Sequence, residues 1–268
     1  MPNCTEVHRW ATMGLWVDGF LCLPCLAPDC AAYLRRWADR WVFVPTGFGP
    51  TIGDIALDIE DDPVGGVAKL ICLEIVHSYA LTALDLPPGA TVIDIGAHVG
   101  IVAIYLARRY PGIRVLAYEP QPDNYARLLR NIAANGVAEQ VIPHLLAVTG
   151  DGRDLALHGD GAINSGGWTA YGTGGAVQTP IASTTLRDIF ATYQVDRCAV
   201  LKIDCEGAEY EILQGAGDLL GWVDYLAGEF HVSSALTARY GAAADLLARC
   251  HQYIPPERVR VGMVNVGA

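Results

Sequence analysis

The residues T-V-I-D-I-G-A-H-V-G, at positions 91–100, place one carboxylate and two glycines at the end of a β-branched run. Asp94, Gly96 and Gly100 give the spacing D-x-G-x-x-x-G, and the apolar segment 101–109 follows. This order predicts a strand, a tight turn and a helix. Glycine allows a sharp turn and lets a helix or a ligand approach the backbone closely. The turn is therefore the first candidate binding site.

Two classes of ligand suit such a turn. A dinucleotide typically requires G-x-G-x-x-G, so that amides at the helix N-terminus hold its pyrophosphate. The middle glycine is missing here, and an acid two residues before Gly96 suits a cation better than a phosphate. S-adenosylmethionine (SAM) carries a sulfonium and an ammonium and no phosphate. The turn therefore favours SAM, with Gly96, Ala97, His98 and Gly100 as the predicted contacts beside Asp94.

Two further acids are expected near the same ligand. Glu119 ends the next apolar run, V-L-A-Y-E, at the carboxyl end of a predicted strand. A carboxylate there can accept both ribose hydroxyls, although capping the helix that begins at Pro122 is an alternative. Glu74 lies on a predicted helix before the first strand. Such a helix often covers the cofactor, so Glu74 is expected to face the SAM ammonium, with a solvated surface position as the alternative.

The strands that follow carry a second set of polar residues. The run A-V-L-K-I-D-C-E-G-A-E, at positions 199–209, ends a strand in Asp204 and Glu206, and G-E-F-H places Glu229 and His231 on one face of the next strand. Parallel sheets bind ligands beyond the carboxyl ends of their strands. These four residues are therefore expected near the methyl group of the donor. Capping a helix is the alternative role for Asp204 and Glu209.

The elements that must position these residues alternate along the chain. Helices are predicted at 31–41, 67–84, 101–109, 122–135, 184–193 and 234–250. Strands are predicted at 42–44, 55–59, 91–95, 115–119, 141–148, 199–204, 223–232 and 259–266. This alternation predicts an α/β, Rossmann-like fold with a mostly parallel sheet and helices on both faces. Residues 1–65 are expected to form an N-terminal extension and candidate substrate cap, and residues 66–268 the SAM-binding domain. Lys202, mid-strand, is expected to pair with an acid.

Composition limits the partners. The chain has 18 Lys and Arg against 29 Asp and Glu, a net charge of −11, which argues against nucleic acid as a partner. No apolar run is long enough for a bilayer and no secretory leader is evident, so a cytoplasmic location without membrane association is expected. The C-x-x-C of Cys22 and Cys25, with Cys4 and Cys30, predicts buried thiols or, as the alternative, a zinc site. Asn164 and Ser165 lie in a Gly-rich stretch that is either a substrate loop or a plain surface loop.

Four segments together carry a family resemblance: D-I-G-A-H-V-G at 94–100, Y-E-P at 118–120, K-I-D-C-E-G-A-E at 202–209 and E-F-H at 229–231. They resemble the FkbM family of SAM-dependent methyltransferases over about residues 65–232. The resemblance implies the class I methyltransferase fold with an antiparallel sheet edge. It also implies O-methylation of a sugar, polyketide or other secondary metabolite, with S-adenosylhomocysteine (SAH) as product. Two features depart from the family: His98 stands where asparagine is usual, and the tail after His231 is short for the antiparallel pair.

The chemistry expected is an in-line displacement in which an acceptor oxygen attacks the sulfonium methyl group. His231 or Asp204 is predicted to remove the proton, with Glu206 and Glu229 orienting the acceptor or the base. Asp204 and Glu229 holding a divalent cation is the alternative; no metal site is predicted. A nicotinamide-dependent oxidoreductase and a non-catalytic SAM-binding module are the competing functions. The acceptor is expected to be a small molecule or glycan; its identity, O- against N- or C-methylation, and the oligomeric state stay open.

Overall fold

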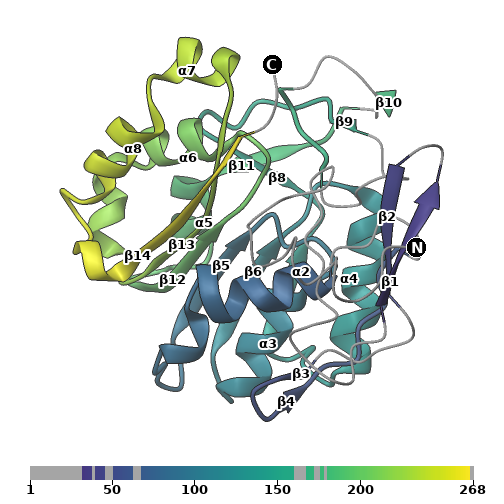
Figure 1. Cartoon of the computed structure of the whole chain (residues 1–268). Helices are drawn as coiled ribbons and strands as arrows, with labels where there is room; N and C mark the ends of the chain where they lie inside the picture. The colour runs from purple at the N-terminus through teal and green to yellow at the C-terminus, as the bar shows by residue number, and fades with distance from the viewer. Residues whose placement is uncertain are drawn as a thin grey trace.

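The computed structural model describes residues 32–37, 40–45, 51–62, 68–159, 167–171, 176–177 and 180–265. Six parallel strands form the central sheet in the order β14-β13-β12-β5-β6-β7 (Figure 1). Their bounds are β5 (Thr91–Ile95), β6 (Arg114–Tyr118), β7 (Val141–His144), β12 (Cys198–Ile203), β13 (Leu226–Val232) and β14 (Val259–Asn265). The chain runs outward from β5 to β7 and then returns to the other side of β5. This order places the topological switch point between β5 and β12.

Helices cover both faces of the sheet (Figure 1). One face packs on α2 (Ala68–Leu73), α3 (Ile101–Arg109) and α4 (Pro122–Ala134), and the other on α5 (Leu186–Thr192), α6 (Glu209–Ala216) and α8 (Ala243–Cys250). Neighbouring strand residues alternate between the two cores: Val92 lies in the first and Ile93 in the second, as the period of a strand requires. The predicted α/β fold is confirmed. Among the described residues, no helix is long and apolar enough to cross a membrane.

The helix predicted at 31–41 is wrong. There β1 (Ala32–Trp37) and β2 (Arg40–Pro45) pair as an antiparallel hairpin, and β3 (Thr51–Ile52) pairs in the same way with β4 (Ile55–Ala56). The helical period rested on a leucine and two tryptophans, and aromatic residues favour strands. The cysteine motif, residues 1–31 and the pair Asn164–Ser165 lie outside the described residues.

Three predicted elements are interrupted in the structure. The strand at 141–148 divides into β7 and β8 (Ala147–Thr149), and β8 leaves the sheet to pair with β11 (Ser183–Thr185). The helix at 234–250 divides into α7 (Ser234–Tyr240) and α8 at Gly241, whose φ is 92°. The helix at 67–84 becomes α2, a π-helical turn η1 (Glu74–Ser78) and a 3₁₀ turn η2 (Leu81–Ala83). Turns of the π type often occur at functional sites.

The antiparallel edge implied by the resemblance is wrong for the described sheet. The edge strand β14 pairs with β13 in parallel, from Leu226 opposite Val259 to Val232 opposite Asn265. The reason is the connection: α7 and α8 return the chain across the sheet, so β14 begins at the same end as β13. The remaining short elements are β9 (His158–Gly159), β10 (Ala176–Val177), η3 (Gly217–Trp222) and η4 (Pro256–Arg258).

Candidate active site

A cavity of about 690 Å³ lies beyond the carboxyl ends of β5, β6, β12 and β13. It is lined by most of the predicted site residues: Glu74, Gly96, Ala97, His98, Glu119, Asp204, Glu206, Glu229 and His231. Two predicted residues do not line it. Asp94 is fully buried beneath it, and Gly100 lies at the start of α3. The residues that follow β5 and β6 and those of β13 and the loop after β12, many positions apart in the chain, therefore meet at the switch point.

The glycine turn is fixed by its neighbours on both sides. Gly96 has φ 74°, and a Cβ built on it would lie 1.8 Å from the carbonyl oxygen of Asp204. The amides of Gly96 and Ala97 both donate to the carbonyl of Tyr118, at 3.0 and 2.9 Å. A Cβ on Gly100 would lie 2.4 Å from Leu128 Cδ1, so Gly100 allows α3 to pack closely on α4. The second glycine positions the turn without lining the cavity.

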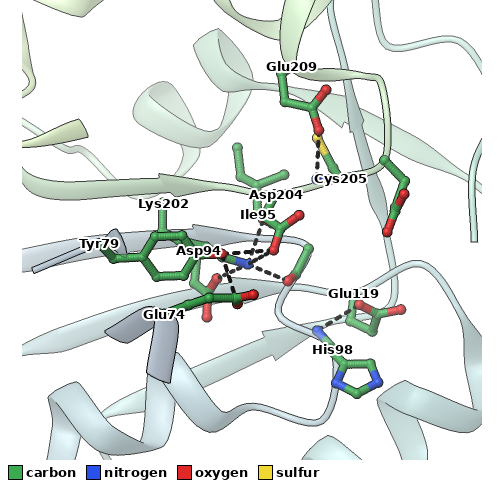
Figure 2. A network of polar contacts seen from close by, with 12 residues as sticks. Glu74, Tyr79, Asp94, Ile95, His98, Glu119, Lys202, Asp204, Cys205 and Glu209 are labelled. Carbon is green, nitrogen blue, oxygen red and sulfur yellow. Dashed lines mark hydrogen bonds and ion pairs between the residues drawn. The ribbon is translucent and has the colours of Figure 1, made fainter. Parts of the chain in front are cut away.

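His98 and Glu119 connect this turn to the end of β6. The His98 amide donates to Glu119 Oε2 at 2.8 Å (Figure 2), and the Gln121 amide donates to Oε1 at 2.9 Å. Burial raises the pKa of Glu119 to about 7, although these two hydrogen bonds act to lower it. Each carboxylate oxygen retains a lone pair for a ribose hydroxyl. Helix α4 is capped by Gln121 and not by Glu119, because the Gln121 side chain accepts from the Asn124 amide.

His98 itself occupies the left-handed region, with φ 52°. Asparagine tolerates this conformation better than most residues, which agrees with the asparagine that the resemblance leads one to expect there. Burial lowers the pKa of His98, and its Nε2 lies 3.9 Å from Asp61 Oδ1. The imidazole is therefore neutral at pH 7 and brings no positive charge into the turn.

Lys202 joins the two halves of the site. Its Nζ lies 3.4 Å from Asp94 Oδ1 and 3.8 Å from Asp204 Oδ2, and it donates to the carbonyl of Gly96 at 2.7 Å (Figure 2). Burial acts to lower the pKa of Lys202, but Asp94 and Asp204 outweigh it and raise the pKa. The prediction that Lys202 pairs with an acid is confirmed. It also explains why Asp94 faces the lysine rather than the cavity.

Tyr79, which directly follows the π-helical turn η1, is a residue of the site that sequence reasoning missed. The Tyr79 hydroxyl lies 3.0 Å from Asp204 Oδ2 and 3.3 Å from Glu74 Oε2 (Figure 2). Burial, reinforced by Asp204 and Glu229, raises the pKa of Glu74 to about 8. At pH 7 a protonated Glu74 can donate to the phenol oxygen while the phenol donates to Asp204. Glu74 therefore belongs to the cavity network.

His231 is held between two glutamates. Its Nδ1 lies 2.9 Å from Glu209 Oε1 and its Nε2 lies 3.3 Å from Glu206 Oε2. Burial acts to lower the pKa of His231, but the Glu209 hydrogen bond and the charge of Glu206 outweigh it and raise the pKa to about 10. The imidazole is thus already protonated at pH 7. This arrangement favours Asp204 over His231 as the group that accepts a proton.

For Glu209 the sequence offers helix capping as the alternative role. It does hold the loop before α6, accepting from the amides of Cys205 and Gly207, each at 3.0 Å. Its bond to His231 is a second role. The sequence signal for both roles is the same acid in a first helical turn, so only the fold distinguishes them.

Asp204, Glu209 and His231 each offer a ligand atom within 4.8 Å of the others. This set differs from the Asp204–Glu229 pair considered from sequence. Both Glu209 oxygens already accept backbone amides, and His231 Nδ1 lies 2.9 Å from Glu209 Oε1. These hydrogen bonds account for the position of Glu209 in the cluster.

The cavity holds more carboxyl groups than cations. Among the described residues, the carboxyl groups of Glu74, Glu119, Asp204, Glu206 and Glu229 line it, against the cations Lys202 and His231. Burial, with Asp204 as the next contribution, raises the pKa of Glu229 to about 7, and burial raises that of Glu206 to about 7. Buried carboxylates favour a cationic ligand. A sulfonium with an ammonium fits this charge, and a pyrophosphate does not.

We expect SAM to bind roughly tenfold more tightly at pH 7.5 than at pH 6. Below its pKa of about 8 Glu74 is neutral, and the acids near 7 are also largely protonated at pH 6. Raising the pH to 7.5 ionises mainly the acids near 7, so attraction to the ligand cation grows. Calorimetric titration at the two pH values measures the ratio. Glu229→Gln, which removes an acid with a pKa of about 7, should flatten the dependence, and equal affinities in the unaltered protein would contradict this description of the cavity.

The chain is similar in sequence to several known methyltransferases. The family model described as "Methyltransferase FkbM domain" matches residues 94–231, just over half of the chain. The chain is 28% identical over 180 residues to Methyltransferase sdnD of Sordaria araneosa, covering 56% of this chain and 70% of that one. It is 26% identical over 184 residues to the 31-O-demethyl-FK506 methyltransferase FkbM of Streptomyces tacrolimicus, covering 57% and 70%.

Two more distant similarities complete the comparison. Hexuronic acid methyltransferase AglP of Haloferax volcanii is 26% identical over 138 residues, covering 52% of this chain and 54% of that one. The crystal structure of Methyltransferase FkbM from Methylobacillus flagellatus KT matches with a TM-score of 0.41 and 17% identity. The match covers 65% of this chain and 40% of the solved one.

Proposed function

The chain belongs to the FkbM methyltransferase family, and on that premise we propose that it transfers the methyl group of SAM to a hydroxyl of a small-molecule or glycan acceptor. The observation that carries the proposal is the acidic cavity at the switch point. There the Gly96 turn and Glu119 lie opposite Asp204 and Glu229. A nicotinamide cofactor would bring a pyrophosphate into this negative site, which disfavours the oxidoreductase alternative.

The donor would be held by the β5 and β6 side of the cavity. Glu119 would accept from the ribose, the Ala97–His98 backbone and Glu74 would surround the methionine end, and Leu146 to Val148 would cover the adenine. Bound SAM supplies an already activated methyl group. The protein then has two tasks, which are to orient the acceptor oxygen and to remove its proton.

The acceptor would lie over β13 and β14. Glu229 and His231 line the cavity there with the apolar side chains of Met263 and Val264, and Trp168 lines it as well. Carboxylates accept hydrogen bonds from hydroxyl groups, and the aromatic and aliphatic walls suit a ring. One relative is named for 31-O-demethyl-FK506 and another for a hexuronic acid, and the first of these names supports an oxygen acceptor. The excess of carboxyl groups over cations in this cavity favours a neutral acceptor, in contrast to the hexuronic acid in the second name.

Proton removal falls to Asp204 in this scheme. Tyr79 donates to Asp204 Oδ2, and Lys202 Nζ lies 3.8 Å from the same oxygen, so the carboxylate is held in one orientation at the edge of the cavity. His231, clamped by Glu209 and Glu206, contributes a fixed positive charge nearby. The imidazole would then position Glu206 and offset the charge of the surrounding acids.

The test uses the intact chain with SAM carrying a trideuterated methyl group. Neutral glycosides and macrolide aglycones are offered as acceptors, and mass spectrometry detects the added methyl. We expect SAH to accumulate with a labelled neutral product, and we expect EDTA to leave the rate unchanged. SAH binding without transfer to any acceptor would favour the non-catalytic module. Binding of NAD in place of SAM would favour the oxidoreductase.

A further inference from the structure

A short segment of the chain lies between the cavity and the loop that follows β12. Residues 167–171, here called the 167–171 strap, are held to β9 by two backbone bonds between Thr169 and His158, at 2.8 and 2.9 Å. Trp168 and Ala170 line the cavity. Thr169, between them, reaches the loop after β12. The strap therefore touches both the proposed acceptor space and the loop that carries Glu206.

The contact to that loop is a single hydrogen bond to a strained residue. The Thr169 hydroxyl donates to the carbonyl of Glu206 at 2.5 Å, and Glu206 has φ 55°. A non-glycine residue in this left-handed region costs roughly 1 kcal/mol or more, and such residues persist where their surroundings hold them. Glu209 holds the neighbouring amides of Cys205 and Gly207 from the other side. The Thr169 bond supplies a second restraint on the same loop.

The strap is anchored by contacts beyond Thr169. The Tyr171 ring packs on Gly207, where an added Cβ would come within 3.0 Å of Cδ2. The Tyr171 hydroxyl lies 3.2 Å from that of Tyr240, and the Arg239 guanidinium lies over both rings. These contacts fix the strap against α7. Thr169 therefore has a firm base from which to hold Glu206.

We propose that Thr169 is a positioning residue, whose hydroxyl keeps Glu206 left-handed so that its carboxylate faces His231 Nε2. The proposal deepens the function proposed above and rests on it only for the claim that the Glu206–His231 pair serves methyl transfer. Because Trp168 and Ala170 flank Thr169 and line the cavity, an acceptor that contacts the strap lies one residue away from the side chain that orients Glu206.

The claim that Thr169 orients Glu206 toward His231 can be tested without any acceptor. The imidazole of His231 faces Glu206 and Glu209 directly, and Asp204 and Glu229 lie in the same cavity. The titration of His231 is followed by NMR of the histidine ring protons in the full chain, with His231→Asn to assign the signal. Thr169→Val removes the donor and keeps the shape. We expect its His231 midpoint to fall by about one unit, because one of two adjacent carboxylates moves away.

Three variants decide the outcome. Glu206→Gln should lower the midpoint in the same direction, Thr169→Ser should keep the original midpoint, and Tyr171→Phe should keep it too because the Thr169 bond remains. An unchanged midpoint in Thr169→Val beside a lowered one in Glu206→Gln would overturn the proposal. No shift in either variant would overturn it as well, since the pair would not exist. Should Thr169→Val not fold, Thr169→Ala carries the same test. Failure of methyl transfer would leave these midpoints unaffected.

Discussion

Asp204→Asn is expected to lower the rate of methyl transfer by about 10²–10⁴-fold, the range of a general base. Asparagine keeps the size of the side chain and still accepts the Tyr79 hydrogen bond, but it cannot take a proton from the acceptor. The neighbouring Lys202 retains Asp94 as an ion-pair partner at 3.4 Å, so the fold should survive. The rate is measured at saturating SAM with a working acceptor, and SAH affinity is measured separately.

The control for this variant is Asp218→Asn. Asp218 lies in η3, pairs with Arg187 on the surface and has a side chain that is 81% exposed. The Asp218→Asn substitution removes the same charge from the chain at a place remote from the cavity, and we expect no change in rate. Unaltered turnover in Asp204→Asn would remove Asp204 from the mechanism. A loss of SAH affinity as large as the loss of rate would instead assign Asp204 to donor binding.

Gly96→Ala is expected to abolish detectable SAM binding, or to weaken it more than about 100-fold. The added Cβ would lie 1.8 Å from the Asp204 carbonyl oxygen, far inside any contact distance, and that oxygen belongs to the backbone and cannot rotate away. The clash can be relieved only by moving β5 and β12 apart at the switch point. That movement would shift the Ala97–His98 backbone and Asp204 together. Calorimetric titration with SAM measures the loss.

Gly136→Ala provides a matched control for that substitution. Gly136 also has positive φ, 66°, but an added Cβ meets nothing within 4 Å. It therefore shares the backbone strain of about 1 kcal/mol without the clash, and SAM affinity should stay as in the unaltered protein. Wild-type affinity in Gly96→Ala would show that the turn does not shape the donor site.

The sequence allowed much of the sheet and of the site to be predicted, because both follow from local patterns. β-branched runs ending in glycine or acid placed β5, β6 and β12 within a residue or two. Since parallel strands end at the same edge, residues as distant as Glu119 and His231 could be expected in one cavity, and both line it. The helix from Pro122 ends at Asn135–Gly136 as the capping pattern predicts.

The parts that could not be predicted depend on contacts between distant segments. The π-helical turn that brings Tyr79 to Asp204 differs from an ordinary helix by one hydrogen-bond step, Tyr79 N to Glu74 O, and nothing in the local pattern marks it. The direction of β14 depends on how α7 and α8 cross the sheet. The Glu209–His231 and Thr169–Glu206 contacts each join a predicted site residue to a residue whose local pattern indicates capping or a loop.

The central claim is that the acidic cavity at the β5–β12 switch point binds the methyl donor. A crystal structure of the chain grown with SAH tests it most directly. We expect SAH in this cavity, with its ribose hydroxyls on Glu119 and its ammonium among the carboxylates beside Gly96 and Glu74. SAH bound elsewhere on the chain, with this cavity left open, would contradict it.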